Sequence, residues 1–232
     1  MKSLQQRVFP WLIMLLVPIA VAMAAVRLII NPWYVEFEYR TPNFPPDPYG
    51  FTMQDRLIYS KIAIDYLVNN AGISFLGDLR FPSGQETPPA TCATMDDCTR
   101  MYNDRELKHM ADVKFVVQAA SRVWYVSLVV LALFGLWAWR GGWLAAFRRG
   151  LRLGGWLTLI LIVVILLLVL FAFNFIFVLF HEIFFRAGTW MFLYSDTLIR
   201  LFPERFWSDT FMMVGGITLA GGLILALVFR RR

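Results

Sequence analysis

Charged residues are scarce in this chain, and their scarcity excludes an ordinary soluble domain. Asp, Glu, Lys and Arg make up 16% of the 232 residues, whereas hydrophobic residues make up 59%. Soluble domains usually have about 25% charged and about 45–50% apolar residues. A chain this apolar cannot hide its side chains in a core of its own, so we expect a lipid bilayer to surround much of it.

Cysteine and histidine are also rare. The chain has two cysteines, Cys92 and Cys98, and two histidines, His109 and His181. This excludes a multi-ligand Cys/His metal site within one chain, and no metal is expected. The His-Glu-x-x-His pattern of zinc proteases, the Gly-x-Ser-x-Gly of serine hydrolases and the phosphate-binding Walker loop are absent from the sequence.

Long apolar runs are abundant, and four of them suit the ~30 Å hydrocarbon core of a membrane. The second run begins in an amphipathic stretch, and the third contains Asn174 as its only strongly polar residue. The sequence therefore predicts an all-α membrane protein, a single membrane domain over residues 1–232. Its predicted spans are Val8–Ile30, Val117–Trp139, Trp156–Phe180 and Phe211–Phe229.

The first run has a rival interpretation as a signal peptide, because Ala22-Met23-Ala24 resembles a cleavage site. The run is longer than the apolar part of a typical signal peptide. We therefore interpret it as a retained helix.

The distribution of charge orients the four spans. The two tails and the connection between the second and third spans hold nine basic residues and none of the 16 acidic residues. By the positive-inside rule, both termini lie in the cytoplasm, and residues 31–116 and 181–210 lie outside. The nine basic residues are Lys2, Arg7, Arg140, Arg148, Arg149, Arg152, Arg230, Arg231 and Arg232.

The first outer segment is too long for a simple loop, so we expect a mainly helical domain. Its Pro-rich start, from Asn31-Pro32 onward, predicts extended chain. Thr52 and Asp55 match a capping box for a helix running to about Asn70, and a second helix should begin near Asn103. The second outer segment, apolar yet charge-bearing, predicts short interfacial helices.

Cys92 and Cys98 lie in a Pro- and Thr-rich excursion of the first outer segment. In an oxidising outer compartment they are expected to form a disulfide with a structural role.

The two histidines are the main candidates for chemistry. Asp112 follows His109 at helical i+3 spacing, so its carboxylate can orient the imidazole. His181 emerges at the end of the third apolar run, where a polar group needs a partner. Alternatively, His109 is a solvated surface residue and His181 caps a helix end. Because the predicted topology puts both on one side of the membrane, a shared pocket becomes possible.

Three motifs stand out along the chain. They are Asn31-Pro32-Trp33-Tyr34 with Tyr39, the block of residues 105–114 around His109-Met110-Ala111-Asp112-Val113, and Phe180-His181-Glu182-Ile183-Phe184-Phe185 followed by Trp190, Asp196, Leu198-Ile199 and Phe202-Pro203-Glu204. Together these motifs resemble the lipoprotein intramolecular transacylase (Lit) family of bacterial membrane proteins. The resemblance spans nearly the whole chain, including the four spans, but does not cover the Cys92/Cys98 excursion.

The resemblance implies a multi-pass enzyme of the bacterial cell membrane that acts on diacylglyceryl-modified lipoproteins among membrane lipids. It would move the sn-2 acyl chain to the α-amine of the N-terminal cysteine of the lipoprotein, with no cofactor. His181 would then be the general base and acid, and His109, oriented by Asp112, would assist. Arg186, Asp196 and Tyr34 would contribute to the substrate pocket.

Two other classes remain open on the sequence alone. The chain can be a non-enzymatic subunit or assembly factor of a larger membrane complex, with the histidines in packing or pigment-binding roles. It can also be a lipid or substrate transporter, although no span holds a row of charged residues and no internal repeat is visible.

Overall fold

A computed structural model describes residues 4–82 and 84–229 of the chain. Over these residues the protein is helical, with an isolated bridge between Arg80 and Arg100 as its only β pairing. The prediction of an all-α fold is therefore confirmed. In chain order the helices are α1 (Leu4–Arg7), α2 (Phe9–Ile29), α3 (Pro32–Tyr39), α4 (Met53–Val68), α5 (Ser74–Gly77), α6 (Pro89–Cys92), α7 (Asp104–Arg140), α8 (Leu144–Phe184), α9 (Thr197–Leu201) and α10 (Glu204–Val228).

Four of these helices, α2, α7, α8 and α10, are long and apolar enough to cross a membrane. This confirms the prediction of four spans. Contacts within the chain form two compact units. Among the described residues, the first unit comprises 4–29, 120–173 and 210–229, and the second comprises 30–82, 84–119 and 174–209.

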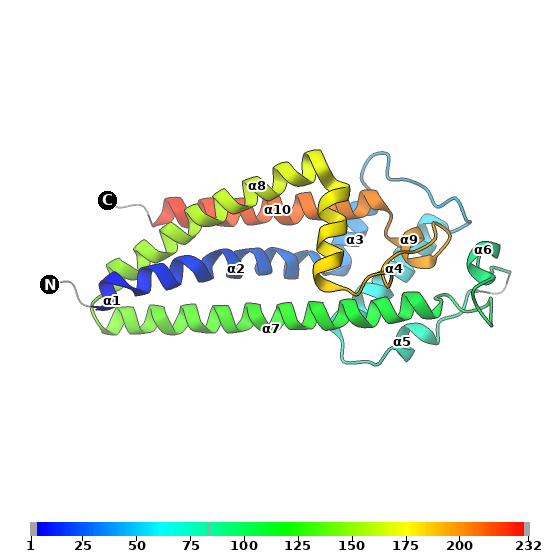
Figure 1. The fold of residues 1–232 in the computed structure, drawn as a ribbon, viewed down its shortest axis with the longest axis horizontal. Helices are drawn as coiled ribbons and strands as arrows, with labels where there is room; N and C mark the ends of the chain where they lie inside the picture. The colour runs from blue at the N-terminus through cyan, green and yellow to red at the C-terminus, as the bar shows by residue number, and fades with distance from the viewer. Residues whose placement is uncertain (1–3, 83, 230–232) are drawn as a thin grey trace. The chain divides into compact units, whose positions relative to one another are not determined.

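Small residues allow the four helices to pack closely in the first unit, where they lie side by side (Figure 1). A Cβ at Gly154 of α8 would lie 2.5 Å from Val17 of α2, and one at Gly155 would lie 2.7 Å from the Gly222 carbonyl of α10. Neither position accommodates a larger side chain without a shift of its neighbours. Close backbone approach at small residues is typical of helices that associate within membranes.

The start of the second unit corrects the prediction of extended chain after Asn31. Residues 32–39 form α3, because the side chain of Asn31 accepts a hydrogen bond from the backbone N–H of Trp33 and Pro32 occupies the first turn. Proline suits this position, since its missing N–H would have no helical partner there.

Helix α4 confirms the predicted capping box. The side chain of Thr52 accepts a hydrogen bond from the backbone of Asp55, and the Asp55 carboxylate accepts one from the backbone of Thr52. Helix α4 contacts α3, α5 and α9 and so forms the centre of the second unit. Its buried face includes Ala63, Tyr66 and Leu67.

The helices α7, α8 and α10 are longer than the predicted spans. The helix expected near Asn103 and the second span are one continuous helix, α7. Helix α8 contains non-helical backbone at Ala172 (φ −145°, ψ 44°). Between α8 and α10 the described chain contains one short helix, α9, rather than the several that were expected, because α8 extends to Phe184 and α10 begins at Glu204.

Candidate active site

The two histidines lie together in the second unit. His109 is on the second turn of α7 and His181 is near the end of α8. Their ring centroids are 6.1 Å apart and their planes differ by 18°, so the rings are stacked. Both side chains are more than nine-tenths buried. The structure thus brings together two imidazoles that are 72 residues apart in the sequence.

The tautomer of His181 follows from its hydrogen bond. Its Nδ1 lies 2.7 Å from the carbonyl oxygen of Phe177, one turn earlier on α8. Because a carbonyl oxygen can only accept, Nδ1 carries the proton in the neutral ring. The lone pair of neutral His181 is therefore on Nε2, which is the nitrogen able to act as a base.

His109 is held differently. Its Nδ1 is buried and has no hydrogen-bond partner among the described residues. Its ring instead meets Phe185 and Phe192 edge-on, with ring centroids 4.8 Å and 5.2 Å away. Such apolar surroundings favour the uncharged form of an imidazole.

The expected contact between Asp112 and His109 is not present. Asp112 is half-buried and makes no hydrogen bond or ion pair with any described residue. Because Asp112 is three residues after His109, both residues lie on the same side of α7. The ring of His109, however, is packed among the aromatic side chains instead of against the carboxylate.

Aromatic residues surround His181, and they are not among the site residues predicted from the sequence. The ring centroids of Phe177 and Trp190 lie 4.1 Å and 4.8 Å from that of His181, and that of Phe185 lies 5.5 Å away. The signal was available, because Phe177, His181 and Phe185 recur every four residues and so share one face of a helix.

Asp196 is the centre of a buried hydrogen-bond network. Its side chain is fully buried, and Oδ1 accepts hydrogen bonds from Thr91 (2.9 Å) and Asn103 (3.1 Å). Oδ2 accepts from the guanidinium of Arg105 (2.9 Å) and from the backbone N–H of Leu193 (2.9 Å). Four donors from this chain therefore occupy the carboxylate of Asp196, and its contact with substrate stays a prediction.

Glu106 joins the start of α7 to α9. Its carboxylate accepts hydrogen bonds from the backbone N–H groups of Asn103 (2.8 Å) and Leu198 (2.7 Å). In return, the side chain of Asn103 accepts from the backbone N–H of Glu106 (2.9 Å), which completes a capping box. The first turns of α7, which carry His109, are therefore firmly placed within the second unit.

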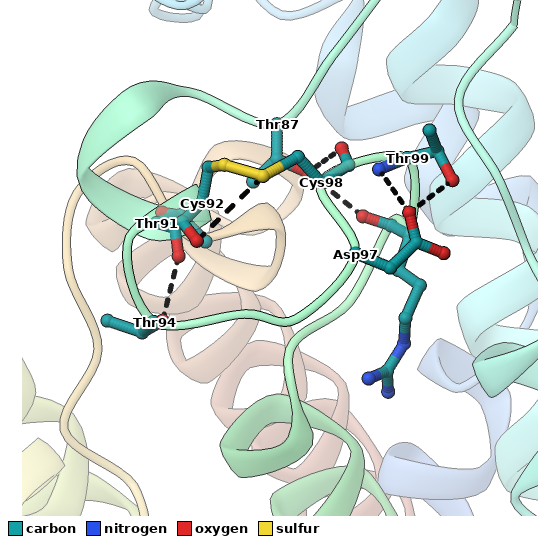
Figure 2. The surroundings of a disulfide bond; sticks show 8 residues. Thr87, Thr91, Cys92, Thr94, Asp97, Cys98 and Thr99 are labelled. Atoms are coloured by element: carbon teal, nitrogen blue, oxygen red, sulfur yellow. Dashed lines mark hydrogen bonds between the residues drawn. A yellow bond between two sulfur atoms is a disulfide. The ribbon is translucent and has the colours of Figure 1, made fainter.

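The predicted disulfide between Cys92 and Cys98 is present, with the two Cα atoms 5.1 Å apart. Figure 2 shows the loop that it closes, where the hydroxyl of Thr94 donates to the carbonyl of Thr91 and that of Thr87 donates to the carbonyl of Cys98. Thr91, which hydrogen-bonds Asp196, directly precedes Cys92. The excursion is thus connected to the network beside the histidines.

The other two predicted pocket residues differ in their surroundings. Tyr34 is buried, its hydroxyl donates to Glu38 (3.5 Å), and its ring lies 5.6 Å from that of Phe206. Arg186 is exposed, and its side chain makes no hydrogen bond or ion pair with a described residue. It is available to an anionic group of a ligand or lipid.

Glu38 is a buried carboxyl whose ionisation should affect stability. Burial and then the neighbouring Asp209 raise the pKa of Glu38 from 4.5 to about 7, against the opposing effects of Arg205 and Tyr34. Because the folded state holds this proton more tightly than the unfolded chain, the resulting stabilisation is complete below pH 4.5 and is lost as the pH rises through 7.

We therefore expect the free energy of unfolding of Glu38→Gln to fall less at alkaline pH than that of the wild type. At pH 8.5 the variant should be more stable than the wild type by on the order of 1 kcal/mol, and at pH 5 the two should agree. Thermal unfolding in detergent across this range measures the difference. The exposed Glu86→Gln should keep the wild-type profile, and an equal profile for Glu38→Gln would contradict the expectation.

Comparison with known proteins decides the family. A sequence profile described as "Lipoprotein intramolecular transacylase Lit" matches residues 11–207. The chain belongs to the Lit family. The family assignment makes this protein an enzyme, in agreement with the prediction, and argues against the subunit and transporter alternatives.

Similar proteins support the same fold. The chain is similar to the solved structure of Lit from Bacillus cereus, with a TM-score of 0.76 and 18% identity over 97% of this chain and 94% of the other. A variant of that enzyme, with one histidine replaced by arginine, matches with a TM-score of 0.66 and 20% identity over 96% and 91%. An uncharacterised protein from Aquifex aeolicus is 26% identical over 86% of this chain and 82% of its own length.

These findings establish a multi-pass membrane enzyme of the Lit family, whose name points to lipoprotein substrates in the membrane. No group of three or more His, Cys, Asp or Glu residues that could hold a metal ion occurs within residues 4–82 and 84–229.

Proposed function

We propose that this enzyme moves the sn-2 acyl chain of an S-diacylglyceryl lipoprotein to the α-amine of its N-terminal cysteine. The product is an N-acyl, S-monoacylglyceryl lipoprotein. The observation that carries the proposal is the stacked pair of buried imidazoles, His109 and His181, in a chain of the Lit family.

His181 is the general base and acid in this scheme. An α-amine has an unperturbed pKa of about 8, and only its neutral form has the lone pair that attacks the ester carbonyl. As the C–N bond forms, the nitrogen of the neutral amine becomes positively charged, and the Nε2 lone pair of His181 accepts one of its protons, because Nδ1 is committed to Phe177. The imidazolium then returns the proton to the glycerol oxygen as the C–O bond breaks.

His109 assists at the same centre. Its ring is stacked on His181, and it has no hydrogen-bond partner among the described residues. A neutral imidazole without a protein partner is available to hydrogen-bond the developing oxyanion of the tetrahedral intermediate or to carry the second proton.

The aromatic surroundings favour transfer over hydrolysis. Phe177, Phe185 and Trp190 cover His181 and limit the access of water to it. The amine, by contrast, belongs to the same molecule as the ester, so its effective concentration is high. No energy source is needed, since the conversion of an ester to an amide is downhill.

We also propose that both termini lie in the cytoplasm and that the histidines act at the outer leaflet. The N-terminal tail with Arg7 and the connection with Arg140, Arg148, Arg149 and Arg152 are basic and lack acidic residues, as cytoplasmic segments do. Lys2, Arg230, Arg231 and Arg232 support the same orientation but lie outside the described residues.

Reporter fusions test this orientation. A green fluorescent protein fused to the C-terminus should fluoresce, and an alkaline phosphatase fused there should be inactive. The reverse pattern would contradict the orientation.

The reaction is tested with purified enzyme and a synthetic S-diacylglyceryl lipopeptide that carries an isotope label in the sn-2 acyl chain. Mass spectrometry of the product should find the label on the α-amine. A lipopeptide with an acetylated α-amine should not react. Release of the labelled chain as free fatty acid, or its transfer to another molecule, would contradict the proposal.

The exposed residues next to the histidines provide matched controls for this experiment. Lys108→Ala and Glu182→Ala change charge beside His109 and His181 without touching either ring contact described above. Both should transfer the label at close to the wild-type rate.

A further inference from the structure

His109 lacks the polar contact that usually orients a functional imidazole. In most such sites the second ring nitrogen donates to a carboxylate or a carbonyl, which fixes both the tautomer and the ring plane. His181 follows this pattern through Phe177. His109 has no hydrogen bond to any described residue, so the packing of its neighbours must set its orientation.

Phe192 contacts His109 and lies next to Leu193, whose backbone N–H is hydrogen-bonded to Asp196. Its ring is half-buried and meets the His109 ring edge-on, with an angle of 63° between the planes. Residues 186–196 contain no helix, so their backbone alone does not hold this ring. The hydrogen bond from Leu193 to Asp196 secures the backbone directly beside Phe192.

Arg105 contacts both the Phe192 ring and Asp196. Its guanidinium carbon lies 5.6 Å from the ring centroid of Phe192, and its Nη2 donates to Asp196 (2.9 Å). Arg105 also lies four residues before His109, so both side chains are on the same face of α7. A planar guanidinium can pair with the carboxylate and cover the ring at once, which a lysine ammonium cannot.

We propose that Phe192 is the positioning residue for His109, and that the Arg105–Asp196 ion pair fixes Phe192 in turn. An aromatic ring anchored by an ion pair thus replaces the hydrogen-bonded carboxylate that orients other functional histidines. The proposal rests on the proposed acyl transfer for its kinetic consequences. Its structural consequence, the orientation of the His109 ring, is independent of the reaction.

The orientation of the ring is measurable, because the chain has only two histidines. Labelling histidine with ¹³C and ¹⁵N gives two sets of ring signals by nuclear magnetic resonance, which His181→Ala assigns. Phe192→Leu should shift or broaden the His109 signals, and Phe192→Tyr should restore them. Arg105→Lys should produce a smaller change of the same kind. Phe75→Leu, which removes a ring stacked on Tyr66, should leave both sets unchanged.

Kinetics provide the second readout. Phe192→Leu should lower kcat by roughly 10- to 100-fold with little change in KM, because misplacement of a catalytic group acts on the chemical step. Phe192→Tyr should recover most of the rate. Unchanged His109 signals in Phe192→Leu, or a rise in KM with kcat intact, would overturn the positioning role. If the wild type transfers no acyl chain while the His109 signals still respond, the proposed function fails and the positioning role stands.

Discussion

Replacement of His181 by alanine should lower the rate of acyl transfer by roughly 10²- to 10⁴-fold, the usual contribution of a general base and acid. In the proposed scheme, Nε2 of His181 both accepts the proton of the amine and returns one to the leaving oxygen. Without it, water must carry these protons in a site that Phe177 and Trp190 cover. Initial rates with the labelled lipopeptide, at saturating and limiting concentrations, measure the loss.

The two histidines should differ in the size of their effects. His109→Ala should reduce kcat less than His181→Ala, because it assists a step that His181 still performs. His181→Gln, which keeps a polar group of similar length but not a base, should be as slow as His181→Ala. A rate for His181→Gln near that of the wild type would contradict the role of His181 as a base.

The second large effect is expected on stability. Asp196→Ala should lower the free energy of unfolding by about 2–5 kcal/mol, since it removes a fully buried acceptor from buried donors, whereas its ion-pair partner Arg105 is 41% exposed and can be rehydrated. The change leaves the amide of Asn103 and the backbone N–H of Leu193 without their acceptor, while the hydroxyl of Thr91 keeps Ser195 Oγ at 2.9 Å. For a chain of this size the thermal midpoint in detergent should fall by on the order of 10 °C.

Asp104→Ala is a matched control for that variant. Asp104 pairs with Arg100 at 2.7 Å, but its side chain is 85% exposed. Exposed ion pairs contribute little, so the loss should be below about 1 kcal/mol. Equal losses for the two variants would show that the network around Asp196 does not hold the second unit together.

Local patterns in the sequence predicted a helix correctly where a single effect, such as hydropathy or helix capping, determines its position. Apolar runs predicted α2, α7, α8 and α10 because hydropathy and length are summed over many residues. Thr52 and Asp55 predicted the start of α4 because a capping box acts within four residues. The prediction for Asn31-Pro32 was wrong, because the proline-rich composition outweighed the N-cap signal of Asn31 followed by proline.

The candidate site depends on contacts that no local pattern contains. Asp196 bonds Arg105 across 91 residues and Thr91 across 105. The charge pattern of the sequence predicted that His109 and His181 lie on the same side of a membrane. The stacking of their rings, however, depends on the fold of the whole second unit. For the same reason the sequence pointed to Asp112 as the partner of His109, whereas the neighbours that the fold supplies include Phe185 and Phe192.

The most direct test of the account is the rate of acyl transfer by the purified double variant His109→Ala/His181→Ala on the labelled lipopeptide. We expect the sn-2 label to reach the α-amine no faster than in the absence of enzyme, while Lys108→Ala and Glu182→Ala remain active. Transfer by the double variant at a rate near that of the wild type would show that the proton transfers do not depend on the two imidazoles.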